Sequence, residues 1–325
     1  MWIDQISCCL LAVLCLHILN RFATQAKALV PTTPQIHELT PDYISDTLEV
    51  KWYEGGSAFP YELNAIWEIH ILHKKPLKEA ARDIIQSRLT GTEKLLHWVW
   101  TSDLPFNCTD HYVRIRYCLV DHGICSEWSE LAKIPGKDSG MYPIDKVVPM
   151  GTDMTFCCVW KRGESMTTIN YGGCRSGHCW TETLTEQSMA LHAEKVALSP
   201  SSGFNAWCLA ETTEDSDESI YGTVLFVGYP PDVPKKLDCT AQNSEEIMCQ
   251  WQEGRRTNLY GTRGTHYFLI EQFSGKNITC IHARRGQQHF QCNFPILTDQ
   301  TKYHFTLEAY NNLGHSKASV LLEID

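Results

Sequence analysis

The run Thr301-Lys302-Tyr303-His304-Phe305-Thr306-Leu307-Glu308-Ala309, close to the C-terminus, gives the clearest sign of the fold. Ring or aliphatic side chains occupy every second position, and polar side chains fall between most of them. Successive side chains of a β-strand point to opposite faces of a sheet, so the apolar set shares one face, which we expect to be buried. The run therefore predicts a long amphipathic strand, with Leu297 just ahead of it.

Two cysteines and a tryptophan precede this strand in the same block. Cys239, Cys249 and Trp251 have the spacing Cys-x9-Cys-x-Trp, which suits two antiparallel strands joined by a disulfide across their turn, with the indole packed on it. The strand resembles strand F of fibronectin type III domains, and the cysteine spacing resembles the first half of the cytokine-binding module of class I cytokine receptors. That resemblance implies a second bridge, between Cys280 and Cys292.

Period-2 alternation recurs along the chain, as in Leu48, Val50 and Trp52, whereas helical periodicity is scarce. Proline and glycine punctuate it at 134–140 and 228–234. A chain of 325 residues exceeds what one core usually organises. We therefore predict an all-β fold of tandem β-sandwiches. Their expected ranges are 29–136 (fibronectin type III-like), 137–229 (immunoglobulin-like) and 230–325 (fibronectin type III). For residues 77–85, a polar hairpin tip is favoured over a turn or two of helix.

The first block carries a second recognisable pattern. Residues 106–116 predict a strand whose outward side chains include Arg114 and Arg116. The following run Cys125-Ser126-Glu127-Trp128-Ser129 resembles the Trp-Ser-x-Trp-Ser box of cytokine receptors, with its first tryptophan replaced by cysteine. The resemblance implies that Trp128 stacks on the two arginines, which is worth roughly 0.5 to 2 kcal/mol per contact. Such a ladder stabilises the fold and is not a ligand site.

The middle block has the cysteines of an immunoglobulin-like domain. Met154, Phe156 and Cys158 alternate inward on one strand, and Cys208 follows 50 residues after Cys158. The bridging cysteine must share the face of Phe156, so parity favours Cys158 over Cys157 for the bridge to Cys208. Two further bridging cysteines, Cys174 and Cys179, are expected to close a small loop, which leaves Cys157 over.

The N-terminus predicts export. Ile6 to Leu19 is nearly all apolar but shorter than the roughly 20 residues that span a membrane, and Ala28 suits cleavage by signal peptidase, with Ala26 as the rival. We therefore expect a signal peptide at 1–28. Twelve cysteines follow it, which indicates an oxidising compartment. No later stretch reaches membrane-spanning length, so we expect a secreted, extracellular chain.

Two sequons predict N-linked glycans, at Asn107 and Asn277.

Composition argues against several classes of function. A net charge of −10 repels nucleic acid and anionic membrane surfaces. His178 beside Cys174 and Cys179 could be drawn as a metal site, but a disulfide loop is the better interpretation in an exported chain. Glu164 and the acidic run 211–218 could be drawn as acid/base or calcium groups, and a solvated loop is the default for such a run. We expect no enzyme, no cofactor and no metal.

The order of domains resembles the leukaemia inhibitory factor receptor and oncostatin-M receptor group, over roughly residues 31–325. The stretches that carry the likeness are 95–100, 153–158, 221–231, 273–275, 305–307 and 311–316. It implies a receptor ectodomain that binds a four-helix cytokine of the leukaemia inhibitory factor or oncostatin M type, with a gp130-like co-receptor as a further partner. We expect a soluble decoy or modulator with no membrane span. An immunoglobulin/fibronectin adhesion protein is the alternative, although such proteins lack the two cytokine-receptor motifs.

The resemblance also places the cytokine contact on the middle block. The expected contact residues are Ser201, Ser202, Gly203, Phe204, Asn205 and Trp207. Phe204 and Trp207 would serve as aromatic anchors, and ordinary sheet packing is the alternative for both. In the first block the resembled receptors suggest a Cys108–Cys118 bridge, and Cys118 and Cys125, which lie symmetrically about the turn at 121–122, could instead bridge a hairpin. One thiol is then left over in each of these two blocks, and either is free or Cys157 finds a partner outside its domain.

Overall fold

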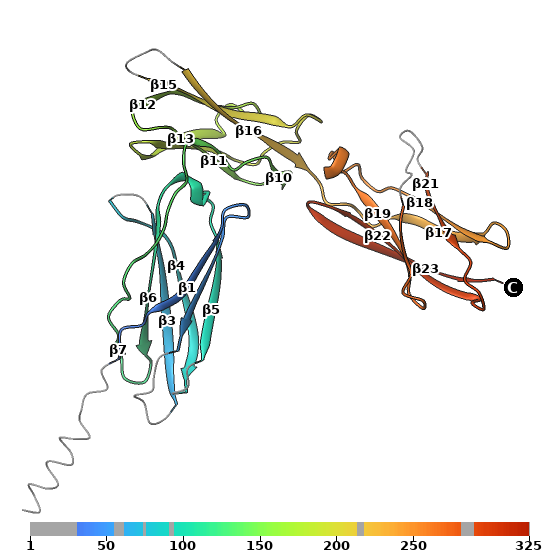
Figure 1. Ribbon diagram of the computed structural model, residues 1–325, viewed down its shortest axis with the longest axis horizontal. Helices are drawn as coiled ribbons and strands as arrows, with labels where there is room; N and C mark the ends of the chain where they lie inside the picture. Colours follow the sequence, from blue (N-terminus) through green and yellow to red (C-terminus); the bar gives the residue numbers. More distant parts are fainter. Residues whose placement is uncertain are drawn as a thin grey trace, which may run out of the picture. The chain divides into compact units, whose positions relative to one another are not determined.

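The computed structural model describes residues 31–54, 62–73, 76–90, 94–212, 218–280 and 289–324. It is all-β, a series of β-sandwiches (Figure 1). The chain divides into two compact units, residues 1–101 with 110–135, and residues 102–109 with 136–325. The predicted signal peptide lies outside the described residues. Within the described ranges, no helix is long and apolar enough to cross a membrane.

The first unit is a sandwich of two antiparallel sheets. One sheet has the order β1 (Ile36–Asp42), β2 (Thr47–Tyr53), β5 (Leu95–Thr101). The other has the order β4 (Lys78–Leu89), β3 (Leu63–His73), β6 (His111–Leu119), β7 (Ile124–Cys125), and β8 (Ala132–Ile134) also pairs with β6. Alternating apolar residues of both sheets form the core. Trp52 and Trp67 contact there with ring centroids 5.4 Å apart, and Trp67 lies 4.9 Å from Tyr117.

The prediction of a hairpin tip at 77–85 is wrong. Residues 76–77 turn, and β4 then pairs with β3 along its length, from His73 opposite Lys78 to Leu63 opposite Leu89. Lysine, glutamate and alanine disfavour strands, but this preference is weak. Hydrogen bonding to the buried strand β3 outweighs it.

Arg114 and Arg116 flank the Trp128 ring, each guanidinium carbon 4.5 Å from its centroid, as expected. The hydroxyls of Ser126 and Ser129, in the degenerate box, accept the backbone N–H groups of Tyr117 and Ile115 on β6. The box therefore hydrogen-bonds to strand β6, and its serines and tryptophan serve the fold.

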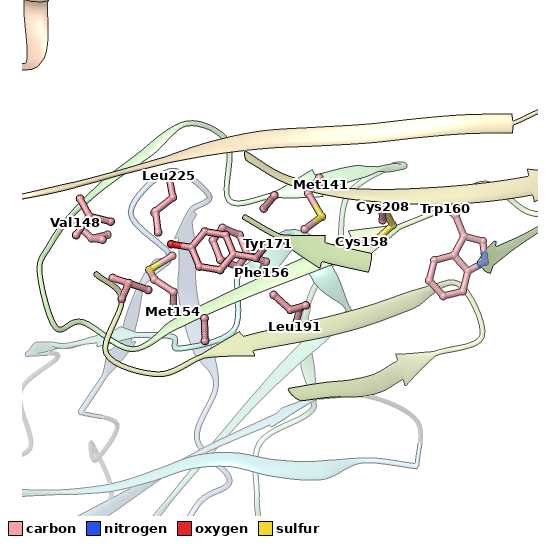
Figure 2. Packing of buried hydrophobic residues seen from close by; sticks show 14 of the residues in the cluster. Met141, Val148, Met154, Phe156, Cys158, Trp160, Tyr171, Leu191, Cys208 and Leu225 are labelled. Carbon is pink, nitrogen blue, oxygen red and sulfur yellow. A yellow bond between two sulfur atoms is a disulfide. The ribbon is translucent and has the colours of Figure 1, made fainter. Parts of the chain in front are cut away.

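The second unit begins with an immunoglobulin-like sandwich. One sheet has the order β13 (Cys179–Thr185), β14 (Ser188–Ala193), β11 (Met154–Val159), β9 (Gly140–Tyr142). The other has the order β10 (Lys146–Pro149), β16 (Glu218–Gly228), β15 (Phe204–Thr212), β12 (Glu164–Tyr171), with β10 parallel to β16. Figure 2 shows the core between them, where the Cys158–Cys208 disulfide lies with Phe156 and Tyr171. The structure also joins Cys174 to Cys179.

The expected bridge between Cys108 and Cys118 is wrong. Cys118 bonds to Cys125, its direct partner across the β6–β7 hairpin, which was the alternative pairing. Cys108 ends the short 3-10 turn η1 (Phe106–Cys108) and bonds to Cys157. Cys158 faces the core, so alternation along β11 turns Cys157 to the outer face of its sheet, where the segment 102–109 packs. Cys157 thus has a partner outside the immunoglobulin-like block.

The third sandwich has one sheet in the order β17 (Lys235–Ala241), β18 (Glu246–Gln252), β21 (His289–Pro295). Its other sheet has the order β20 (Asn277–Thr279), β19 (His266–Glu271), β22 (Lys302–Asn311), β23 (Gly314–Glu323). Disulfides join Cys239 to Cys249 and Cys280 to Cys292. The apolar face of β22 is buried, and the Tyr303 hydroxyl accepts the backbone N–H of Leu297 at 3.0 Å.

The two sequons differ in access. Asn277 is exposed on β20. Asn107 is only 8% exposed, it lies in η1, and the next residue, Cys108, is held in a disulfide. A glycan cannot be seated on a buried asparagine of the folded chain, because a glycan is bulky and polar. The expected glycan at Asn107 therefore does not fit the structure.

Candidate functional site

The predicted contact loop is a tight turn that is fixed at its base. Ser201 and Ser202 are exposed at its tip, and the N–H of Gly203 donates to the Pro200 carbonyl at 2.9 Å. Below the tip, the Ser199 hydroxyl accepts the N–H of Val227 at 3.0 Å. The side-chain amide of Asn258 donates to the carbonyls of both Ser199 and Val227, each at 2.9 Å. These bonds hold the loop to strand β16, so it presents a defined shape.

Gly203 has to be glycine at this turn. Its φ of +81° lies in the left-handed region, which residues with a Cβ atom rarely adopt. A Cβ there would also come within 2.3 Å of the Val224 side chain and 3.1 Å of the Leu225 carbonyl oxygen. Gly203 therefore shapes the loop and offers no side chain to a ligand.

Phe204 packs inward. Its ring is half-buried against the core and meets Tyr171 edge-on, with ring centroids 5.8 Å apart. Along the same strand Ala206, Cys208 and Ala210 are buried, which sets the inward parity. Of the two roles that the sequence leaves open for Phe204, the structure supports sheet packing.

Asn205 and Trp207 lie on the opposite, outer side of β15. Asn205 is exposed, and the Trp207 indole is 37% exposed. The residue directly across from Trp207 on β16 is Gly222, which has no side chain to cover the ring. A large, stiff aromatic group is thus held partly exposed by a strand that is paired on both sides, to β16 and to β12.

The register of β15 with β16 extends this surface. Leu209 lies opposite Ile220, and Asn205 opposite Val224. Directly paired residues share a face, so Leu209, Ile220 and Val224 join Trp207 on the outer side. Ile220 is 70% exposed. We call this surface the Trp207 face, and it comprises Asn205, Trp207, Leu209, Ile220, Gly222 and Val224.

Sequence reasoning missed the β16 half of the Trp207 face. The available signal was the alternation of Ile220, Gly222, Val224 and Phe226. The pairing of β15 with β16, and its register, decide which residues lie beside Trp207. A pattern within one strand does not reveal this pairing.

Glu164 is a structural acceptor. Its carboxylate accepts hydrogen bonds from the Ser219 hydroxyl (2.7 Å), the Tyr221 hydroxyl (3.0 Å) and the Lys161 N–H (2.9 Å). Burial acts to raise the pKa of Glu164, but these hydrogen bonds to its charged form outweigh burial and lower the pKa. An acid/base catalyst near neutral pH needs the opposite shift. Of the acidic run 211–218, residues 213–217 lie outside the described part of the chain.

The structure does not support a metal site at His178, Cys174 and Cys179. Cys174 and Cys179 bond to each other, so neither supplies a thiolate. The His178 ring lies 3.5 Å from Glu194, and both side chains are about half exposed. Among the described residues, no group of three or more possible ligands is gathered.

Comparison with known families covers most of the chain. Residues 27–135 match the family described as "Leukemia inhibitory factor receptor D2 domain", residues 141–228 the "Leukemia inhibitory factor receptor, Ig-like domain", and residues 230–325 the "Leukemia inhibitory factor receptor D4 domain". The chain belongs to the leukaemia inhibitory factor receptor and oncostatin-M receptor group. This is a group of receptors and not of enzymes.

Two human relatives illustrate the likeness. The human leukaemia inhibitory factor receptor is 38% identical over 92% of this chain and 27% of its own length. The human oncostatin-M-specific receptor subunit beta is 28% identical over 91% of this chain and 30% of its own length. The chain therefore spans less than a third of either receptor. The 199–205 loop and the Trp207 face both lie in the segment that matches the Ig-like domain. Asn258, whose side chain hydrogen-bonds to the base of the loop, lies in the segment that matches the D4 domain.

Proposed function

We propose that this chain is an extracellular cytokine-binding protein that holds a four-helix cytokine of the leukaemia inhibitory factor or oncostatin M type. The names of its relatives supply the class of ligand. The observation that carries the placement of the site is the exposure of Trp207 on a fully paired strand of the Ig-like sandwich. The loop tip at Ser201 and Ser202 adds polar groups beside the start of that strand.

Exposed aromatic groups on rigid elements make good binding anchors. Interface hot spots are enriched in tryptophan, and they sit in the middle of surfaces that exclude water around them. The Trp207 face fits this description along β15 and toward β16, where Leu209, Ile220 and Val224 place apolar side chains near the indole, while the exposed Asn170 of β12 lies on its other side. β15 and β16 are paired along the whole face, so little conformational entropy remains to be lost there on binding.

Charge favours a basic partner. Glu211 and Glu218 are paired at the end of β15 and β16, next to the Trp207 face. Across the whole chain, 38 acidic residues outnumber 28 basic ones. Complementary potentials raise the rate of encounter more than the final affinity. We therefore expect the association rate to fall as salt is added, with a smaller effect on dissociation.

A secreted chain of this kind would act as a soluble decoy or modulator. Six disulfides support export to an oxidising compartment. By mass action, a chain that occupies one face of the cytokine competes with a membrane receptor for that face once its concentration exceeds its dissociation constant. A gp130-like co-receptor would then contact another face of the bound cytokine.

Added to responsive cells, the purified chain should lower receptor phosphorylation, and an unchanged dose response at micromolar chain would contradict the decoy role.

Calorimetric titration of the purified chain with leukaemia inhibitory factor and with oncostatin M tests binding itself. The chain should bind at least one of the two cytokines, and it should sediment as a monomer in analytical ultracentrifugation. Self-association without cytokine binding would instead favour an adhesion protein.

A further inference from the structure

The outer face of the sheet β20-β19-β22-β23 carries an aromatic surface that the cytokine site does not use. Phe268 of β19 stacks on Tyr310 of β22, with ring centroids 5.2 Å apart and ring planes 10° from parallel. His266 lies 5.4 Å from the same tyrosine. Their chain neighbours Tyr267, Leu269 and Ala309 are buried in the core, so the stacked pair faces outward.

A depression of about 610 Å³ lies beside this pair. Its wall combines the two rings with polar groups, among them Glu308, Asn312 and His315. Glu308 also pairs with Lys317 at 3.4 Å. Aromatic faces pack against C–H groups, while carboxylate and amide groups accept and donate hydrogen bonds. This combination suits a sugar, which has an apolar ring face and a rim of hydroxyl groups.

The neighbouring edge strand places a glycan acceptor on the same face. Asn277 of β20 is exposed and lies directly opposite Ile270, and Thr279 lies directly opposite Phe268. Directly opposed residues share a face. Asn277, Ile270 and Phe268 therefore all face outward, with Phe268 on the diagonal from Asn277, where Cβ atoms are about 7–8 Å apart.

We propose that this face is the seat of the chain's own N-linked glycan. The first sugar on Asn277 rests on Ile270 and the Phe268 ring, and the sugars that follow extend toward Tyr310 and the depression beside it. The glycan thereby covers an apolar surface that would otherwise favour association between copies of the chain. This inference rests on the export of the chain, but not on the cytokine site.

The test uses the whole chain, secreted from mammalian cells with the leader of the expression vector, so export is supplied. Mass spectrometry of the peptide that contains Asn277 measures occupancy, which should be near complete. NMR of chain labelled with ¹³C in N-acetylglucosamine then reports the N-acetyl methyl of the first sugar. Ring currents should shift this methyl upfield, and Phe268→Ala should return it to the position seen in a denatured glycopeptide.

Two further variants complete the design. Tyr260→Ala removes an exposed ring of the same sandwich that lies outside this sheet, and it should leave the methyl shift unchanged. Thr279→Ala prevents glycosylation and should lower the melting temperature by a few degrees, but it should have no such effect when combined with Phe268→Ala.

Three results would overturn the proposal. The first is an unoccupied Asn277. The second is an occupied Asn277 whose methyl shift matches the denatured glycopeptide in both the parent and the Phe268→Ala chain. The third is weaker cytokine binding by Phe268→Ala while Thr279→Ala leaves the melting temperature unchanged, which would make the face a protein-binding surface. Because the Trp207 face lies in another sandwich, failure of cytokine binding there would leave the glycan result readable.

Discussion

Cys108 bonds to Cys157 while the next residue in the chain, Cys158, bonds to Cys208, so two adjacent cysteines serve opposite faces of one sheet. The first bond joins η1, which belongs to the second unit, to the outer face of β11. The second crosses the core of the immunoglobulin-like sandwich.

Removing the outer bond should cost more than removing a short-range one. The Cys108–Cys157 bond closes a separation of 49 residues and the Cys174–Cys179 bond one of only 5. Loop-closure entropy gives about 4 kcal/mol for the first and about 2 kcal/mol for the second. Double replacement by alanine, measured by chemical denaturation, should show this order. Equal losses, or a non-reducing peptide map that joins Cys108 to Cys118, would contradict the pairing.

Glu271 should make the third sandwich sensitive to acid. Its fully buried carboxylate accepts the N–H groups of Phe273, Ser274 and His304 and the Ser274 hydroxyl. Burial acts to raise its pKa, but these hydrogen bonds lower it to about 2. Because the pKa of Glu271 is lower in the folded chain than in the unfolded chain, its ionised carboxylate stabilises the fold by about 3 kcal/mol. This stabilisation is complete above about pH 4.5 and is lost as the pH falls toward 2.

Glu271→Gln tests this directly. The variant should be less stable at pH 7 and should lose less stability than the parent chain between pH 5 and pH 2. Glu323→Gln removes an exposed carboxylate paired with Lys302 and serves as the control, with little expected change. Identical acid profiles for the parent and Glu271→Gln would show that the carboxylate is not the titrating group.

The box tryptophan should matter for stability and not for binding. Trp128→Leu keeps an apolar cover but loses the ring that lies between Arg114 and Arg116. Two cation–π contacts predict a loss of about 1 to 4 kcal/mol in the free energy of unfolding. Calorimetric affinity for the cytokine should stay the same. A large loss of affinity at unchanged stability would instead place Trp128 in a ligand site.

Glycan mapping should distinguish the two sequons. In chain secreted from mammalian cells, peptide mass spectrometry should find a glycan at Asn277 and none at Asn107, because Asn107 is buried. Thr109→Ala, which destroys the buried sequon, should therefore leave the glycan mass unchanged, whereas Thr279→Ala should reduce it. Folded chain that carries a glycan on Asn107 would contradict the burial of η1.

Sequence patterns predicted the features that depend on local alternation. The buried face of β22 and the inward position of Cys158 follow from parity within a single strand. The Cys108–Cys157 bond could not be predicted in this way, because it depends on the segment 102–109 packing against a distant strand. Strand β4 was missed because its composition disfavours a strand, and only pairing with β3 makes it one.

The candidate site shows the same division. Alternation along β15 is a local pattern, and it gives Trp207 the outward parity and Phe204 the inward parity of Ala206. The neighbours that complete the Trp207 face, Ile220 and Val224, required the register of β15 with β16. The support of the loop by Asn258 is a contact across 59 residues of sequence and has no local signature.

Trp207→Ala tests the central claim most directly. Trp180 of β13 is the matched control, because it is 50% exposed on the other sheet of the same sandwich. Calorimetric titration with leukaemia inhibitory factor and oncostatin M should show that Trp207→Ala weakens binding by about 2 kcal/mol or more, roughly 30-fold, at an unchanged melting temperature. Trp180→Ala should bind like the parent chain. Undiminished affinity of Trp207→Ala, or an equal loss in both variants, would contradict a cytokine site on the Trp207 face.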